Sequence, residues 1–413
     1  MKSAVRGEVS QGLIISLNSN KFHLRNLCMK ILLLGKFYPI KGGVEKVMWD
    51  ITRGVSARGV DCDMLCACLT GEMPSDSEDA STITGSKGAR LIRLGDHGRI
   101  ICVPAYRKVA ATMMAPAMIG ALKRMCQGYD IIHIHHPDPM AALALRLSGY
   151  KGRVIVHWHS DILSQKVLMK FYRPLQNWML RRADTIVGTT PVYVEQSPEL
   201  KAFQDKVTYI PIGIEPVPEA PQKAAEIRSR YPGKKIIYSL GRLVPYKGYE
   251  YLIRAARYLN DGYQIVIGGG GPLRKDLQKL IDGLDLGGRV TLLGFVPQED
   301  AAAWFRACDV FCLSSVWKTE AFAIVQIEAM SCGKPVVATN IPESGVSWVN
   351  SDGESGVNVT PADPVALADA IMAVTADEEA YADLSRAARK RYEAMFTYEG
   401  MIDKCIELYE NKR

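Results

Sequence analysis

Short apolar segments alternate with helical segments along this chain, and the alternation runs twice. In the first half, strands are expected at 29–36, 60–68, 89–94, 130–136, 153–159, 184–189 and 207–212. In the second half they are expected at 235–240, 264–268, 289–294, 309–314 and 335–339. Apolar runs of this length separated by helices are typical of βαβ units in a mainly parallel sheet. The pattern therefore predicts an α/β chain with two doubly wound, Rossmann-like domains.

Prolines crowd the stretch between the two repeats, at 211, 216, 218, 221 and 232, which is typical of a linker. The 413-residue length also fits two domains. We expect an N-terminal domain over 29–213, a linker over 214–233, and a C-terminal domain over 234–395. A last helix over 396–413 is expected to pack back on the first domain. Open parallel sheets bind ligands beyond the carboxyl ends of their strands, so both domains should face a central cleft.

The first 28 residues show no pattern that joins the rest, and we expect a disordered extension with Met29 as the natural start. No run reaches the roughly 18–20 apolar residues that a membrane-spanning helix needs. Cysteines such as Cys66 and Cys312 lie inside apolar strands, which indicates unpaired thiols in a reducing compartment. The sequence therefore predicts a cytoplasmic protein.

Positive charge is concentrated in the first half of the chain. The formal net charge is +7, yet residues 87–182 alone hold sixteen Lys or Arg and four acids. Nucleic acid, anionic lipid, a phosphorylated acceptor or a plain solvated face could each explain this excess. A helix is expected over 104–125, where Arg107, Lys108, Lys123 and Arg124 flank an apolar run. It could lie on an anionic membrane or simply cover the sheet.

Three glycine-containing turns follow strands and open helices. Gly42 and Gly43 allow backbone N–H groups at a helix start to approach a diphosphate. Arg242 and Lys247 bracket the next such turn and could reach one phosphate together, as a planar fork and a point charge. The Gly-rich turn at 268–271 allows close backbone approach, or is merely flexible.

Two acids form the most specific pattern. Glu320 lies in a loop and Glu328 on the following helix, in an otherwise apolar segment. A carboxylate accepts two hydrogen bonds well, which suits vicinal hydroxyls of a sugar or a ribose. Because a buried acid without partners is costly, Glu328 should have a hydroxyl partner. The alternative is a salt bridge to Arg242 or Lys247.

Five of the seven histidines fall between His133 and His159. His133 and His135 alternate on one strand and His157 and His159 on another, so each pair faces one side of its strand. Zinc binding is conceivable, but the Glu and Cys neighbours usual in such sites are missing. We therefore expect no metal, and assign these rings to hydrogen bonding with substrate or to charge tuning.

These motifs, in this order from Met29 onward, resemble retaining glycosyltransferase family 4, whose two-Rossmann architecture is called GT-B. Val156–Ile162 and Ile324–Met330 resemble bacterial mannosyltransferases of O-antigen and exopolysaccharide assembly, which implies GDP-mannose or a related donor. The alternatives are a UDP-sugar donor, or a nucleotide-sugar 2-epimerase of the same fold. A nucleic-acid-binding protein is disfavoured because no helix-turn-helix, zinc knuckle or aromatic ribonucleoprotein motif is present. The acceptor, the linkage and the oligomeric state stay open.

The resemblance also implies a role for each site residue, with no metal and no cofactor; the nucleotide-sugar is the donor substrate. His159 would lie against the transferred sugar, and Asp161 would orient His159 or the acceptor. Arg242 and Lys247 would neutralise the leaving diphosphate, Glu320 would hold sugar hydroxyls, and Glu328 would hold the ribose. The remaining donor-binding positions are Gly42, Gly43, Gly269, Gly270, Phe295, Val296, Phe322, Ala323 and Ile324.

One position departs from the family. Ala323 stands where the family usually has Gly, so a methyl group would lie beside the sugar. The expected reaction moves a hexose with retained anomeric configuration to a lipid-linked or oligosaccharide acceptor. It proceeds by front-face attack, with positioning and leaving-group charge stabilisation as the main contributions. The enzyme is expected to work as a peripheral protein on the inner face of the cytoplasmic membrane.

Overall fold

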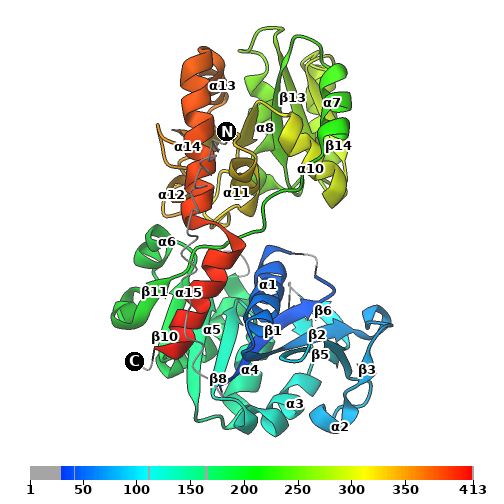
Figure 1. The fold of residues 1–413 in the computed structure, drawn as a ribbon, viewed down its shortest axis with the longest axis vertical. Coiled ribbons are helices and arrows are strands. Elements are labelled where there is room, and N and C mark those ends of the chain that lie inside the picture. The colour runs from blue at the N-terminus through cyan, green and yellow to red at the C-terminus, as the bar shows by residue number, and fades with distance from the viewer. Residues whose placement is uncertain (1–28, 41, 110–111, 163–165, 412–413) are drawn as a thin grey trace, which may run out of the picture.

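The computed structural model describes residues 29–40, 42–109, 112–162 and 166–411. The chain forms two α/β domains, one above the other, with a narrow connection along one side (Figure 1). The predicted extension over 1–28 lies outside the described residues. In the described part of the chain, no helix is long and apolar enough to cross a membrane.

The N-terminal domain is built on a nine-stranded sheet in the order β11-β10-β9-β8-β1-β2-β5-β4-β3. Strands β11 through β5 run parallel, and β4 and β3 extend the edge antiparallel. The strands are β1 Lys30–Tyr38, β2 Asp61–Leu69, β3 Glu78–Asp79, β4 Arg90–Arg93, β5 Gly98–Ala105, β8 Ile131–His136, β9 Arg153–Trp158, β10 Thr185–Gly188 and β11 Val207–Tyr209. A separate hairpin pairs β6 Arg107–Val109 with β7 Thr112–Met114.

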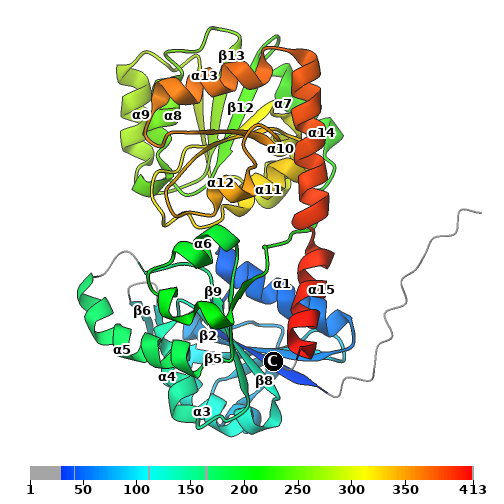
Figure 2. The same cartoon turned by 90° about the vertical axis from the view of Figure 1, so that its left-hand side faces the viewer.

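Helices cover both faces of this sheet (Figure 2). Asp138 caps α4 by accepting hydrogen bonds from two backbone N–H groups, and Thr190 caps α6 by accepting one from Tyr193, as short polar side chains do at helix starts. The helices are α1 Gly43–Ala57, α2 Ser81–Thr84, α3 Ala117–Met125, α4 Pro139–Ser148, α5 Lys166–Arg182 and α6 Pro191–Gln196.

The C-terminal domain holds a fully parallel six-stranded sheet in the order β14-β13-β12-β15-β16-β17. In this doubly wound order, successive strands are added on one side of β12 as far as β14 and then on the other side from β15 onward. Such sheets bind ligands at this switch point, between β12 and β15. The strands are β12 Lys235–Leu240, β13 Tyr263–Gly268, β14 Val290–Gly294, β15 Val310–Leu313, β16 Val336–Thr339 and β17 Gly356–Val359. The helices are α7 Pro221–Ser229, α8 Tyr249–Ala255, α9 Arg274–Gly283, α10 Gln298–Ala307, α11 Ile324–Ser331, α12 Val346–Val349, α13 Pro364–Thr375 and α14 Glu378–Met395.

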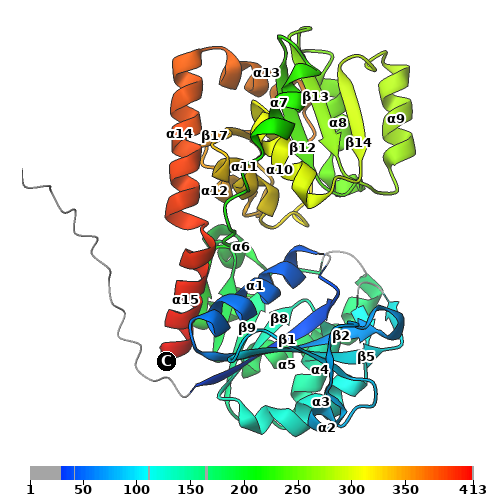
Figure 3. The ribbon, with the colours of Figure 1, turned by 45° about the vertical axis from the view of Figure 1, so that its right-hand side comes forward.

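The chain crosses between the domains twice, and the two crossings pair with each other. Ile214, in the first crossing from the N-terminal to the C-terminal domain, forms a parallel β-bridge with Thr397, in the crossing back. A Cβ at Gly213 would lie 2.1 Å from the carbonyl oxygen of Thr397, so only glycine permits this approach. After the return, α15 (Tyr398–Glu410) packs along α1 of the N-terminal domain (Figure 3).

Two expectations need correction. The helix expected over 104–125 is instead the end of β5, the β6–β7 hairpin and the short helix α3. The apolar residues of this run belong to different elements, but Met113, Met118 and Leu122 are all buried in the same hydrophobic core. Residues 221–229 of the expected linker form helix α7, because Pro221 occupies the first helical turn, where its missing N–H costs nothing.

Candidate functional site

A cavity of about 370 Å³ lies between the two domains and holds much of the predicted site. The loop after β9 and the start of α1 form its lower wall, while the loop after β15 and the start of α11 form its upper wall. Its lining comprises Gly43, Val44, His159, Ser160, Thr189, Ile212, Tyr246, Lys247, Thr319, Glu320, Ala321, Phe322, Ala323, Ile324 and Val325. The predicted central cleft is therefore present, and residues from both sheets reach it.

A buried ion pair lies at the centre of the upper wall. The Nζ atom of Lys247 is 2.5 Å from Oε2 of Glu320, and both side chains are about nine-tenths buried. Ser315 also donates a hydrogen bond of 2.8 Å to the same carboxylate oxygen. Burial alone would lower the pKa of Lys247, but the Glu320 carboxylate outweighs that effect and raises the pKa. Lys247 is therefore a permanent cation in the cavity.

The second acid, Glu328, has a different environment. Glu328 lies on α11, and burial raises the pKa of its carboxyl to about 7, partly offset by the positive charge of Lys46 on α1. The alternative salt bridge expected for this acid is made by Glu320 instead, with Lys247. Arg242 is exposed and is not part of the cavity lining formed by the described residues.

Glycines set how closely the walls approach. Gly42 is the N-cap of α1, and Gly43 begins that helix at the cavity. A Cβ at Gly43 would lie 3.4 Å from Cδ1 of Ile324 in the other domain, so the helix start contacts the upper wall directly. The start of α1 and Lys247 thus line the same space, and a helix N-terminus beside a cation suits an anion.

The glycine-rich turn after β13 acts through the backbone. Gly269 has φ +133°, and a Cβ there would lie 1.8 Å from the carbonyl oxygen of Gly241. Leu243 donates a backbone hydrogen bond of 2.9 Å to the carbonyl of Gly270. Only glycine permits the close approach of residue 269 to Gly241. Together with the Leu243–Gly270 hydrogen bond, this approach holds the loop that carries Arg242 and Lys247 against the turn. Neither Gly269 nor Gly270 belongs to the cavity lining that the described residues form.

Phe295 and Val296 lie outside the interdomain cavity. They line a second space of about 300 Å³ within the C-terminal domain, together with Arg230 and Trp304. The Phe295 side chain is 82% exposed, so a flat ring is available to solvent beside that space.

Ala323 adopts a conformation that the family's glycine would adopt without strain. Its φ is 60° and its ψ is 78°, and it forms the N-cap of α11. For an L-residue other than glycine this left-handed region costs roughly 1–2 kcal/mol. Phe322 and Ile324, on either side of it, line the cavity as expected. The methyl group of Ala323 therefore reaches the cavity on a strained backbone.

The predicted histidine pairs form one buried stack beneath the lower wall. The rings of His157 and His159 are 4.2 Å apart between centroids, and those of His135 and His159 are 5.1 Å apart. The stack continues to His133, whose Nδ1 lies 2.8 Å from the hydroxyl of Tyr409 on α15. Burial lowers the pKa of His157 to about 3, and burial with neighbouring charges lowers the pKa of the other three rings well below the ordinary value. All four rings are neutral at neutral pH.

The stacking geometry disfavours a shared metal ion. His133, His135 and His157 do offer ring nitrogens within 4.8 Å of one another. A coordinated ion must lie in the plane of each ring, yet His133 and His157 are nearly parallel at 11° and 5.2 Å apart. The positive charges of Lys36 and Arg153 also act on these rings. The set fits neutral stacked imidazoles better than a zinc site.

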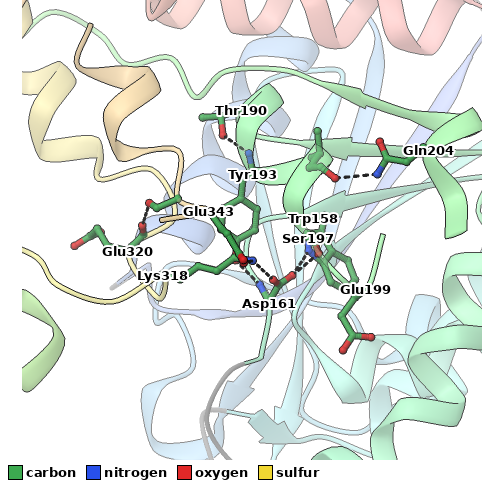
Figure 4. A network of polar contacts seen from close by, with 12 residues as sticks. Trp158, Asp161, Thr190, Tyr193, Ser197, Glu199, Gln204, Lys318, Glu320 and Glu343 are labelled. Carbon is green, nitrogen blue, oxygen red and sulfur yellow. Dashed lines mark hydrogen bonds and ion pairs between the residues drawn. The ribbon is translucent and has the colours of Figure 1, made fainter. Parts of the chain in front are cut away.

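Asp161 lies behind the cavity and connects the domains. Its carboxylate accepts hydrogen bonds from Nε1 of Trp158 at 3.0 Å and from Oγ of Ser197 at 2.7 Å (Figure 4). Its other oxygen lies 3.1 Å from Nζ of Lys318, which belongs to the C-terminal domain and also pairs with Glu343 at 2.8 Å. His159 is held by His135, at 2.9 Å, rather than by Asp161.

Sequence reasoning missed several residues at this site. Lys318, Tyr246 and Thr189 were not singled out, although Lys318 and Tyr246 each lie next to a predicted motif. A lysine two residues before Glu320 is an available signal. Its partner could not be inferred, because the pairing with Asp161 spans both domains.

The two halves match separate family models. Residues 42–213 match the model described as Glycosyl transferase 4-like domain, and residues 222–391 match Glycosyl transferases group 1. The O-antigen chain mannosyltransferase C of Escherichia coli is 31% identical over 92% of this chain and 98% of that protein. The D-rhamnosyltransferase WbpZ of Pseudomonas aeruginosa is 28% identical over 89% and 92%, respectively.

Solved structures share the fold. A sucrose-phosphate synthase from Thermosynechococcus elongatus superposes with a TM-score of 0.72 at 23% identity, over 92% of this chain and 98% of that one. HepE from Anabaena, in complex with UDP, gives 0.72 at 22% identity over 92% and 99%. These likenesses show the GT-B arrangement of two Rossmann-like domains.

Proposed function

We propose that this chain, which belongs to the group 1 glycosyltransferases and carries a glycosyltransferase 4-like domain, transfers mannose from GDP-mannose with retention of configuration. The acceptor is a lipid-linked or oligosaccharide intermediate of cell-surface polysaccharide assembly. The observation that carries the proposal is the interdomain cavity, in which Lys247, Glu320, His159 and the start of α1 meet.

The leaving diphosphate is stabilised from two directions. The ammonium group of Lys247 has three N–H donors, and the contact with Glu320 does not use all of them. A phosphate oxygen can therefore bind the same ammonium group. The N-terminus of α1 supplies backbone N–H groups and a favourable dipole. Arg242, exposed on the same loop as Lys247, is a second cation for the diphosphate. Each such donor raises kcat by a factor of about 10²–10³, by analogy with the loss of kcat when one oxyanion-hole donor is removed.

Carboxylates hold the sugar and the ribose. Glu320 lies beside the position that the diphosphate takes, so its second oxygen is available to hexose hydroxyls. Glu328 binds the ribose hydroxyls, which give its partly buried carboxyl the hydrogen bonds it needs to ionise. His159 contacts the hexose from the lower wall. Front-face attack by the acceptor follows, and the departing phosphate takes the acceptor proton.

Donor identity is tested by thermal shift and product analysis. GDP-mannose should raise the melting temperature more than GDP-glucose, UDP-glucose or ADP-glucose, because binding to the folded state alone stabilises it. NMR of the product should show the α-anomer, the configuration of the donor. A β-linked product would contradict retention. Release of an epimerised sugar nucleotide without any acceptor would replace transfer by epimerisation.

The central pair gives a second test. Lys247→Ala and Glu320→Ala should each abolish most transfer while the protein stays folded by circular dichroism. The matched control is Lys223→Ala, which breaks an exposed ion pair with Asp300 at 2.7 Å and should leave transfer unchanged. Near-normal activity in either cleft variant would remove Lys247 and Glu320 from the site.

The acceptor side of the proposal rests on an exposed surface of the N-terminal domain. The β6–β7 hairpin exposes Tyr106 and Val109 beside two basic residues, and α5 exposes Phe171 and Leu168 beside Lys170 and Arg173. Both segments contact α4. Exposed aromatic residues among cations suit an anionic lipid surface, at about 1 kcal/mol per cation. We place the enzyme peripherally on the inner face of the cytoplasmic membrane.

Liposome sedimentation tests the membrane surface. The protein should bind vesicles containing phosphatidylglycerol and not neutral phosphatidylcholine vesicles, with binding weakened by salt. Phe171→Ser and Tyr106→Ser should reduce binding, whereas Tyr258→Ser, at an exposed tyrosine of the other domain, should not. Equal binding to both vesicle types, or binding to neither, contradicts a peripheral membrane location.

A further inference from the structure

The histidine at the cavity is held by a second, fully buried histidine. His135 lies on β8 and His159 follows β9, the neighbouring parallel strand. The Nδ1 atom of His135 is 2.9 Å from Nε2 of His159. His135 is completely buried, whereas His159 lines the cavity. His159 therefore has one ring nitrogen tied to the protein interior and only Nδ1 left for a ligand.

Both rings are neutral, so each carries a single N–H. Burial and the surrounding imidazoles lower the pKa of His135 and of His159 well below the ordinary value. In a hydrogen bond between two neutral imidazoles, one ring must donate and the other accept. Whichever ring donates fixes the tautomer of both.

The surroundings of His135 decide the direction. Its Nε2 is buried and has no hydrogen-bond partner among the described residues. If His135 accepted at Nδ1, its proton would be on Nε2, as a buried N–H without an acceptor. If His135 donates from Nδ1, only a lone pair is left without a partner. Orphaned buried donors are the rarer case in proteins, so the second arrangement is favoured.

We propose that His135 is a positioning residue that donates from Nδ1 to Nε2 of His159 and thereby fixes His159 as the Nδ1–H tautomer. His159 then presents an N–H donor to the cavity. A nucleotide-sugar is rich in oxygen acceptors, which this N–H can bind, including phosphate and ring oxygens that carry no proton; the other tautomer can only accept from a hydroxyl. The catalytic consequence rests on the proposed function, whereas the tautomer itself is a property of the free protein.

Nitrogen-15 NMR on the full chain, selectively labelled at histidine and free of ligand, tests the tautomer. Long-range proton–nitrogen correlations distinguish Nδ1–H from Nε2–H, and the His159 signals are identified by their loss in His159→Asn. Wild-type His159 should carry its proton on Nδ1. A proton on Nε2 of His159 in the wild type overturns the inference, and this measurement needs no variant at His135.

Substitutions at His135 test the positioning role. The amide nitrogen of Asn occupies the place of Nδ1, so His135→Asn keeps the donor, whereas His135→Leu removes it. With GDP-mannose and an acceptor, His135→Leu should lower kcat about 10–100-fold with little change in KM, as loss of an orienting partner does, and Asn should restore kcat to within about threefold. His133→Leu, a matched loss of a buried ring that bonds Tyr409 instead, should leave the His159 tautomer unchanged.

The outcomes separate the two proposals. A Leu variant that keeps both the wild-type tautomer and the wild-type kcat overturns the role of His135. A Leu variant that changes the tautomer and keeps the wild-type kcat also overturns it. If GDP-mannose supports no transfer by the wild type, the proposed function fails, while the NMR result still decides the tautomer.

Discussion

Two residues of the α11 segment, whose N-terminal end lines the cavity, are held in states that cost free energy in the unliganded protein. Glu328 is a carboxylic acid whose neutral form burial favours, and Ala323 has a left-handed backbone. Such features concentrate at ligand sites, where the ligand or the surrounding structure offsets them. One substitution at each residue removes the unfavourable state, so the free-energy cost to stability can be measured separately from the contribution to ligand binding.

Replacing Glu328 with Gln should change stability in a pH-dependent way. Burial raises the pKa of this carboxyl from 4.5 to about 7, so the folded state holds a proton that the unfolded state has lost between these two values. Wild-type stability therefore falls as pH rises through this window, and the loss persists above it. At pH 8 Glu328→Gln should be more stable than the wild type by on the order of 1–3 kcal/mol.

The comparison is made by urea unfolding at pH 4 and pH 8, where the two proteins should differ only at the higher pH. The variant should also bind GDP more weakly, because a carboxylate is lost from the ribose site. Equal stabilities at pH 8 would show that Glu328 is already ionised and solvated.

Replacing Ala323 with Gly should stabilise the fold. The left-handed φ of 60° costs Ala about 1–2 kcal/mol, while the flexibility of Gly costs roughly 0.5–1 kcal/mol, so a net gain of several tenths is expected. Ala321→Gly is the matched control two residues away, where φ is not positive, and it should destabilise. Urea unfolding measures both, and a loss of stability in Ala323→Gly would contradict the strain.

At the scale of elements, close helix contact fixes α15 against the N-terminal domain. Gly54 in α1 lies beneath Ile402 of α15, and a Cβ there would lie 2.5 Å from the isoleucine side chain. Arg153 donates hydrogen bonds of 2.9 Å to the last carbonyls of α15, and Tyr409 bonds His133. The C-terminal helix is thus joined to the domain that contains the histidine stack.

Two glycine-to-alanine substitutions measure this contact. Gly54→Ala should destabilise by about 1–3 kcal/mol, because Ile402 is fully buried and cannot easily move aside. Gly120→Ala in α3 has nothing within 4 Å of the new Cβ and should stabilise by roughly 0.5–1 kcal/mol. Thermal unfolding compares them, and equal effects would show that α15 is not tightly packed.

At the scale of the whole molecule, one buried ion pair ties the two domains across the cleft. Lys318 and Asp161 belong to different domains, and their side chains are 12% and 5% exposed. A buried charge that loses its partner is expensive, so this pair favours the arrangement in which the domains meet. The two chain crossings are also paired with each other, at Ile214 and Thr397.

Lys318→Met should open the molecule. Without Lys318, Asp161 escapes its uncompensated burial by hydration, which requires the domains to separate. Small-angle X-ray scattering should show a larger radius of gyration than in the wild type, and kcat should fall more than global stability. Lys223→Met is the control, since its partner Asp300 is in the same domain and is exposed. An unchanged radius in Lys318→Met would mean that other contacts hold the cleft closed.

The sequence by itself determined the two doubly wound domains, because strand and helix periodicity is encoded locally. It also located the turns that carry Gly43, Lys247 and Glu320, since parallel strands place their following loops at one edge. It failed over 104–125, where one apolar run serves a strand end, a hairpin and a short helix.

Only the tertiary structure decided which of these groups meet. The partners of Lys247, Asp161 and His159 each come from a distant segment, and no local pattern records such pairings. The same holds for the neutrality of the histidines, because burial by neighbouring elements sets the pKa of each ring. Local periodicity thus specified the framework, and long-range packing specified the charges and hydrogen bonds within it.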